Sequence, residues 1–69
     1  MADRGDVQRE RVLHAIAELT RANGYSPTVR EIAAKVGLST TGTFDHLTIL
    51  RDRGMVYLPR PGAGWMLRS

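Results

Sequence analysis

The hydrophobic positions in the first third of the chain recur at helical spacing. They would share one face of a helix and are, in order, Val12, Leu13, Ile16 and Leu19. Asp6 is a residue type that caps the start of helices, and Gly24 is one that ends them after a position such as Asn23. The pattern predicts one amphipathic helix, capped by Asp6 and running to about residue 23.

A second, shorter pattern covers residues 29–36. Pro27 favours extended backbone before it, and Thr28 can cap the helix. Glu31, three positions later, can bond back to the Thr28 amide and complete a capping box. Gly37 suits the left-handed conformation that ends a helix. We therefore expect a short helix followed directly by another, as in a helix-turn-helix, with a buried stripe of Ile32, Ala33 and Val36.

A third helical pattern covers residues 40–53 and ends at Gly54. Three of its apolar residues are spaced three apart, and a fourth extends the same face. The stripe predicted to face the core therefore consists of Phe44, Leu47, Leu50 and Ile49. In a helix-turn-helix this helix carries the function, because it is the one that can enter a DNA groove.

After Gly54 the hydrophobic period changes. Residues 55–58 and 65–67 are short runs of strand-favouring residues, and the segment between them contains two prolines and two glycines. The pattern predicts a hairpin whose Trp65 packs on the core, and residues 25–28 are a candidate third strand. The expected fold is mainly α with a small β-hairpin: a three-helix winged helix-turn-helix. It forms a single domain, 1–69, with a core of about 6–67.

Composition narrows the class of protein. Sixty-nine residues without cysteine allow one small core and no disulfide or thiolate metal site. The chain has no apolar run near the ~20 residues that a membrane span needs, so we expect a cytoplasmic, nucleoid-associated protein with no membrane contact. A net charge of +3 permits nucleic-acid binding. No spacing of carboxylates or histidines indicates a shared catalytic site, so we expect neither an enzyme nor a metal or other cofactor.

The start of the third helix carries the candidate base-reading residues. Short polar side chains there let a helix end approach base edges, and one of them must cap the helix. An aspartate could accept a bond from a cytosine amino group or simply favour the helix dipole. A histidine could donate to guanine or pack in the interior. The set is Ser39, Thr40, Thr41, Gly42, Thr43, Asp45 and His46.

A second set of residues could contact the DNA backbone or the minor groove. Arg60 lies between two prolines that stiffen the predicted turn, and Arg30 lies in the first turn of the second helix. Surface solubility is the competing interpretation for each arginine. The complete backbone set is Thr28, Arg30, Arg51 and Arg60.

These motifs together resemble the N-terminal DNA-binding domain of the LexA repressors of the bacterial SOS response. The resemblance rests on residues 23–33, on Val36-Gly37-Leu38, and on the later His46-Leu47, Leu50 and Arg53-Gly54. It implies a sequence-specific regulator of transcription that represses by binding double-stranded DNA, with helix 40–53 in the major groove and wing 57–67 on the backbone or minor groove.

Two features depart from the family pattern. Between Leu38 and Leu47 the chain is one residue shorter, in the segment that reads bases. LexA repressors also continue into a self-cleaving domain with a serine and lysine pair, and nothing after Ser69 supplies one. We expect either a fragment of a longer repressor or a stand-alone relative, such as a phage or mobile-element regulator.

Two questions about partners stay open at this point. A homodimer on DNA would let two half-sites add, but the chain has no coiled-coil heptad to form one. The alternative function is a winged-helix protein-interaction module, for example a phage-like antagonist of a host regulator or polymerase. Low net charge and the shortened reading segment are compatible with such a protein partner.

Overall fold

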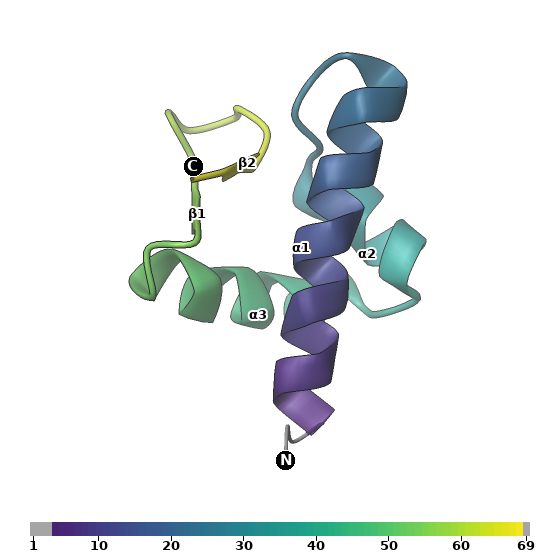
Figure 1. Ribbon diagram of the computed structural model, residues 1–69, viewed down its shortest axis with the longest axis vertical. Coiled ribbons are helices and arrows are strands. Elements are labelled where there is room, and N and C mark those ends of the chain that lie inside the picture. The colour runs from purple at the N-terminus through teal and green to yellow at the C-terminus, as the bar shows by residue number, and fades with distance from the viewer. Residues whose placement is uncertain (1–3, 69) are drawn as a thin grey trace.

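The chain folds into three helices followed by a two-stranded hairpin, as Figure 1 shows. The computed structural model describes residues 4–68. The elements are α1 (Arg4–Asn23), α2 (Val29–Val36), α3 (Thr40–Asp52), β1 (Val56–Tyr57) and β2 (Met66–Leu67). The predicted class, a mainly helical winged helix-turn-helix, is confirmed. Residues 1–3 and 69 of the expected domain lie outside the described part.

The start of α1 differs from the prediction. Asp6 is not its N-cap, because the helix already includes Arg4 and Asp6 lies within the first turn. A carboxylate in the first turn still interacts favourably with the helix dipole. The Asp6 carboxylate also pairs with Arg9 and lies 3.8 Å from the Arg53 guanidinium. Asp6 therefore links the start of α1 to the end of α3.

The bounds and both ends of α2 are as predicted. The Thr28 hydroxyl accepts a bond from the Glu31 amide at 3.2 Å, and the Glu31 carboxylate accepts one from the Thr28 amide at 2.9 Å. Gly37 has φ 74° and donates its amide to the Ala33 carbonyl at 2.9 Å. The capping box and the left-handed glycine thus set the length of the helix from both sides.

The inward stripe of α3 was predicted wrongly at two positions, Phe44 and Ile49. Ile49 is 36% exposed, because it projects about 100° or more from both buried leucines. Leu47 and Leu50 are buried, but Thr43 is fully buried with them while Phe44 is 48% exposed. At about 100° per residue, Thr43 projects between Leu47 and Leu50, whereas Phe44 projects about 60° beyond Leu47 on the other side. The two leucines therefore direct Thr43 inward, although phenylalanine is the more hydrophobic residue. The helix also ends at Asp52, one residue before the predicted end.

The three helices and the hairpin share one hydrophobic core. Figure 1 shows α1 along the longest axis, with α3 and the hairpin on one side of it. The buried cluster takes residues from α1, α2, α3 and the hairpin: Val12, Ala15, Ile16, Ile32, Val36, Leu47, Leu50, Val56 and Trp65. Because α3 contributes to this shared cluster, its position depends on all its neighbours.

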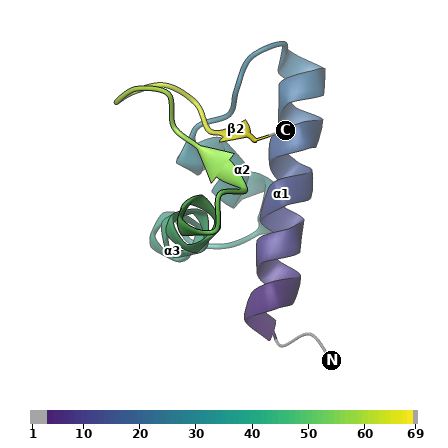
Figure 2. The ribbon, with the colours of Figure 1, turned by 60° about the vertical axis from the view of Figure 1, so that its left-hand side comes forward.

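The hairpin is seated on the turn that precedes α2. Its strands pair antiparallel, with Val56 opposite Leu67. Trp65 is 3% exposed, which confirms its predicted core position, and its amide donates to the Pro27 carbonyl at 2.8 Å. Residues 25–28 do not form the predicted third strand. Figure 2 shows the hairpin tip extending away from α1, on the side where α3 lies.

No helix among residues 4–68 combines the length and the apolar character that crossing a membrane requires.

Gly64 is required by close packing against the turn before α2. A Cβ added there would lie 1.9 Å from the Ser26 carbonyl oxygen. We expect Gly64→Ala to lower the free energy of unfolding by about 3 kcal/mol, because backbone cannot move aside as a flexible side chain can. In the control Gly62→Ala, the added Cβ meets open space and only the left-handed φ of 84° is strained, at about 1 kcal/mol. Urea denaturation of both variants measures the difference, and equal losses would contradict the packing argument.

Thr43 offers a test of whether its buried hydroxyl lacks a hydrogen-bond partner. Its hydroxyl is enclosed and has no hydrogen-bond partner among the described residues. Thr43→Val keeps the shape and removes the unsatisfied polar group, so we expect stability to rise by about 1 kcal/mol in chemical denaturation. A clear loss of stability would mean that the hydroxyl has a partner.

Candidate nucleic-acid interface

The outward face of α3 is polar and carries two of the predicted base-reading residues. Thr41 and Asp45 are exposed and Thr48 is partly exposed. These three residues project within about 60° of one another, roughly opposite the buried stripe. α3 and the hairpin tip lie on the same side of α1 (Figure 2). This is a projecting helix face of the kind that enters the major groove.

The N-terminus of α3 contains a cap and two exposed threonines. Ser39 is the N-cap, and its hydroxyl accepts a bond from the Gly42 amide at 3.0 Å. Ser39 and Gly42 are thus engaged with each other at the helix start. Thr40 and Thr41 between them are exposed, with no hydrogen bond from their side chains to the described residues. Their hydroxyl and methyl groups are available to a ligand.

Thr43 does not belong to this face. Its exposure is 0%, so the prediction that it contacts bases is wrong. The sequence-based assignment followed from its place in a run of small polar residues. The orientation of α3, fixed by Leu47 and Leu50, overrides that local pattern.

His46 lies on a different flank of α3 from the polar face. Its side chain is partly buried, and Nδ1 is enclosed with no partner among the described residues. It projects about 100° from Asp45, away from Thr41. This position favours the packing interpretation of His46 over base reading.

Phe44 was predicted to face the core and is instead exposed beside the polar face of α3. Its ring makes an edge contact with the Trp65 ring, with centroids 6.3 Å apart and planes at 71°. Its carbonyl accepts a bond from the Thr48 hydroxyl at 3.0 Å. In an ideal helix, Thr43 projects about 40° from Leu47 on the side of Leu50, whereas Phe44 projects about 60° from Leu47 on the other side. This difference is the sequence signal that could have predicted an exposed Phe44.

Two arginines and one threonine of the predicted DNA-backbone set remain available for phosphate. Arg30 is exposed in the first turn of α2, and Arg60 is exposed in the hairpin loop. Neither guanidinium group forms an ion pair or hydrogen bond with a residue in the range 4–68. Thr28 is exposed, and its hydroxyl can still donate while it accepts from the Glu31 amide. These groups come from two segments that flank the outward face of α3 along the chain.

The other C-terminal arginines already have partners. Arg51 Nε lies 3.9 Å from the Asp52 carboxylate, a loose pair between exposed side chains. Arg53 lies near Asp6, and the Arg68 guanidinium sits 4.9 Å from the centre of the Tyr57 ring. Of the four, Arg60 is therefore the most available for an external phosphate.

The capping box places a carboxylate beside these groups. The amide of Thr28 holds the pKa of the Glu31 carboxyl below its ordinary value of 4.5. The Tyr25 hydroxyl donates to Glu31 at 3.2 Å, and the charge of Glu31 raises the pKa of Tyr25 above 10.0. The negative charge of Glu31 is thus retained for the helix start.

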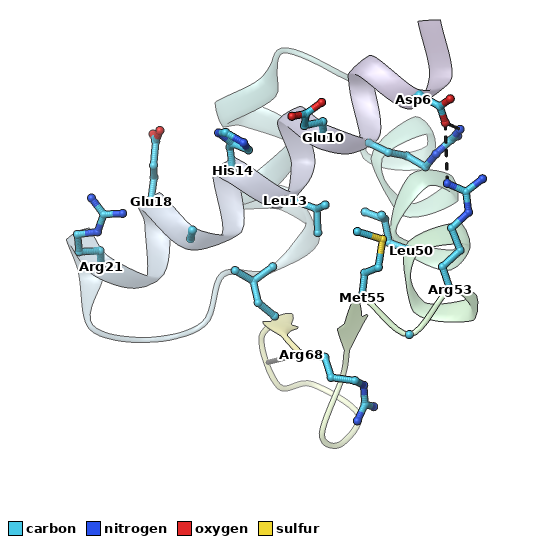
Figure 3. A pocket seen from close by; sticks show the side chains of 14 residues that line it. Asp6, Glu10, Leu13, His14, Glu18, Arg21, Leu50, Arg53, Met55 and Arg68 are labelled. Atoms are coloured by element: carbon cyan, nitrogen blue, oxygen red, sulfur yellow. Dashed lines mark hydrogen bonds and ion pairs between the residues drawn. The ribbon is translucent and has the colours of Figure 1, made fainter. Parts of the chain in front are cut away.

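A groove of 840 Å³ lies between α1, the end of α3 and the hairpin (Figure 3). Its lining mixes apolar side chains such as Leu13 and Met55 with carboxylates and arginines. Residues 4–68 contain no cluster of three or more His, Cys, Asp or Glu side chains suited to a metal ion. None of the predicted DNA contacts lines this groove.

Comparison with known proteins gives one consistent family. The family model of the LexA DNA binding domain matches residues 1–63. The LexA repressor of Corynebacterium jeikeium is 45% identical over 56 residues, which are 80% of this chain and 20% of that protein. That of Sorangium cellulosum is 44% identical over 54 residues, which are 77% of this chain and 23% of that protein. That of Leptospira biflexa is 35% identical over 49 residues, which are 71% of this chain and 24% of that protein. The matched part of the chain therefore spans between a fifth and a quarter of the length of these relatives.

The lowered pKa of Glu31 predicts a pH dependence of stability. A carboxyl whose pKa is lower in the folded than in the unfolded state contributes stability above the unfolded pKa and loses it as pH falls through the folded pKa. As pH falls below 4.5, the wild type should therefore lose stability that Glu31→Gln, which keeps a neutral acceptor, does not lose. Thermal unfolding between pH 6 and about 3 measures this. Parallel profiles for the two proteins would contradict the assignment.

Proposed function

The chain belongs to the family of LexA DNA-binding domains, and we propose that it binds double-stranded DNA sequence-specifically and represses transcription by occupying operator DNA. The observation that carries this proposal is the outward polar face of α3, a helix that lies on the same side of α1 as the hairpin tip (Figure 2). Family membership supports DNA as the ligand, and the geometry supports α3 as the element that reads it.

In the proposed complex the start of α3 lies in the major groove. Thr40 and Thr41 are short enough to let the helix backbone approach base edges, and each offers a hydroxyl and a methyl group. Asp45, one turn further along, can accept a bond from a cytosine amino group. Ser39 and Gly42 stabilise the helix start that presents these residues.

The proposed phosphate contacts come from segments on both sides of α3 along the chain. Thr28 and Arg30 approach the backbone from the start of α2, and Arg60 approaches from the hairpin loop. Such contacts fix the register of α3 without carrying sequence information. Arg60 also suits a narrow minor groove, where the negative potential is enhanced.

Two copies bound to adjacent half-sites would increase both affinity and specificity. One α3 offers few base contacts, and regulators with this motif commonly use two-fold symmetric sites one helical turn apart. The symmetry of the DNA that the chain selects therefore reports whether a homodimer forms on DNA.

The test of this function is selection of bound duplexes from a randomised DNA library at near-physiological salt. A recovered motif is the expected result, and a repeated, inverted motif would report two copies. Retention without a motif would overturn sequence-specific reading. No retention would overturn DNA binding and favour a protein partner.

Arg60 and Thr41 should separate phosphate contact from base reading. Arg60→Ala is expected to weaken binding to every duplex alike and to reduce the slope of log affinity against log salt by about 0.9, the value for one phosphate contact. Thr41→Ala is expected to relax preference at one base pair and to leave the salt slope unchanged. Fluorescence anisotropy at several salt concentrations measures both quantities. A uniform loss on all duplexes for Thr41→Ala would refute this division of roles.

A further inference from the structure

One aromatic residue, Phe44, lies at the edge of the outward polar face of α3 and takes no part in the contacts proposed above. The Phe44 side chain is 48% exposed, although Thr43 beside it is fully buried. A single exposed hydrophobic residue is ordinary on a protein surface. The position and support of this ring are the features that need explanation.

The ring of Phe44 is held rather than loose. Its edge contact with Trp65 fixes one side, and Trp65 is itself 3% exposed and bonded through its amide to Pro27. A side chain that is already positioned loses little conformational entropy when it contacts a ligand.

The neighbours of Phe44 are the candidate base-reading residues. In helical projection it lies about 40° from Thr40 and Thr48 and about 60° from Thr41. A helix that brings these threonines to base edges therefore brings the phenyl ring to the same wall of the groove. The apolar group displayed in the major groove is the C5 methyl of thymine.

We propose that Phe44 is a specificity-determining residue that contacts the C5 methyl group of a pyrimidine. The ring then requires thymine at one position of the site, and 5-methylcytosine presents it with the same methyl group. Cytosine and uracil lack that group and leave the ring partly hydrated. This inference rests on the proposed function, since it assigns a ligand group to the same helix face.

The decisive experiment removes single methyl groups from the DNA. Each thymine of the selected duplex is replaced in turn by uracil, which keeps all hydrogen bonds of the base pair. At one position the wild type is expected to lose about fourfold in affinity, the equivalent of one buried methyl group. For Phe44→Ala the same replacement is expected to change nothing.

Cytosine methylation gives the converse test at the same position. With cytosine there, the wild type should bind weakly, and 5-methylcytosine should restore about fourfold. Phe44→Ala should bind both duplexes equally. Ile49→Ala is the matched control, since Ile49 is 36% exposed on the same helix but projects about 140° away from Phe44. It should discriminate as the wild type does.

Several results would overturn the inference. One is a wild type that binds every uracil-substituted duplex as it binds the parent, and another is a Phe44→Ala protein that retains the discrimination. Circular dichroism checks that the variant is folded, and Phe44→Gln replaces it if Phe44→Ala is not. Failure of the wild type to select any motif would instead overturn the proposed function itself, so the two failures are distinguishable.

Discussion

The burial of Leu47 and Leu50, with Thr43 between them in projection, fixes the rotation of α3 about its own axis. These side chains pack against a cluster supplied by α1, α2 and the hairpin. A rotation of α3 by one residue, about 100°, would expose a leucine and bury a polar side chain. The inward stripe therefore decides which residues face outward. The same packing that stabilises the domain thus sets the surface that we propose to meet DNA.

A second constraint ties the hairpin to the helix-turn-helix. Gly64 allows the hairpin backbone to approach Ser26, and the amide of Trp65 bonds to Pro27, immediately before the cap of α2. The hairpin and the start of α2 are therefore held together, and Trp65 also braces Phe44 on α3. The start of α2, α3 and the hairpin, which carry the proposed DNA contacts, are therefore connected to one another through Trp65 and its neighbours.

Residues close together in sequence predicted much of this arrangement. Contacts between residues far apart in sequence determine the rest. The capping box of Thr28 and Glu31 and the glycine at 37 involve neighbours in sequence, so the bounds of α2 were readable from the chain. Thr43 is buried and Phe44 is exposed, the reverse of the prediction, because the direction of Leu47 and Leu50 sets the orientation of the helix. The close approach of Gly64 to Ser26 joins residues far apart in sequence, which no local pattern reports. Of the candidate site, Thr41 and Asp45 were found on the outward face, whereas Thr43 was not.

The central claim is that α3 meets DNA with the face opposite its leucines, and NMR titration of the labelled domain with a selected duplex tests it most directly. We expect the largest shift changes at the amides of Thr41 and Asp45, at the Phe44 ring and in the hairpin loop around Arg60. The groove lined by Leu13 and His14 should change little. Maximal changes in that groove, with an unperturbed α3 face, would contradict the account.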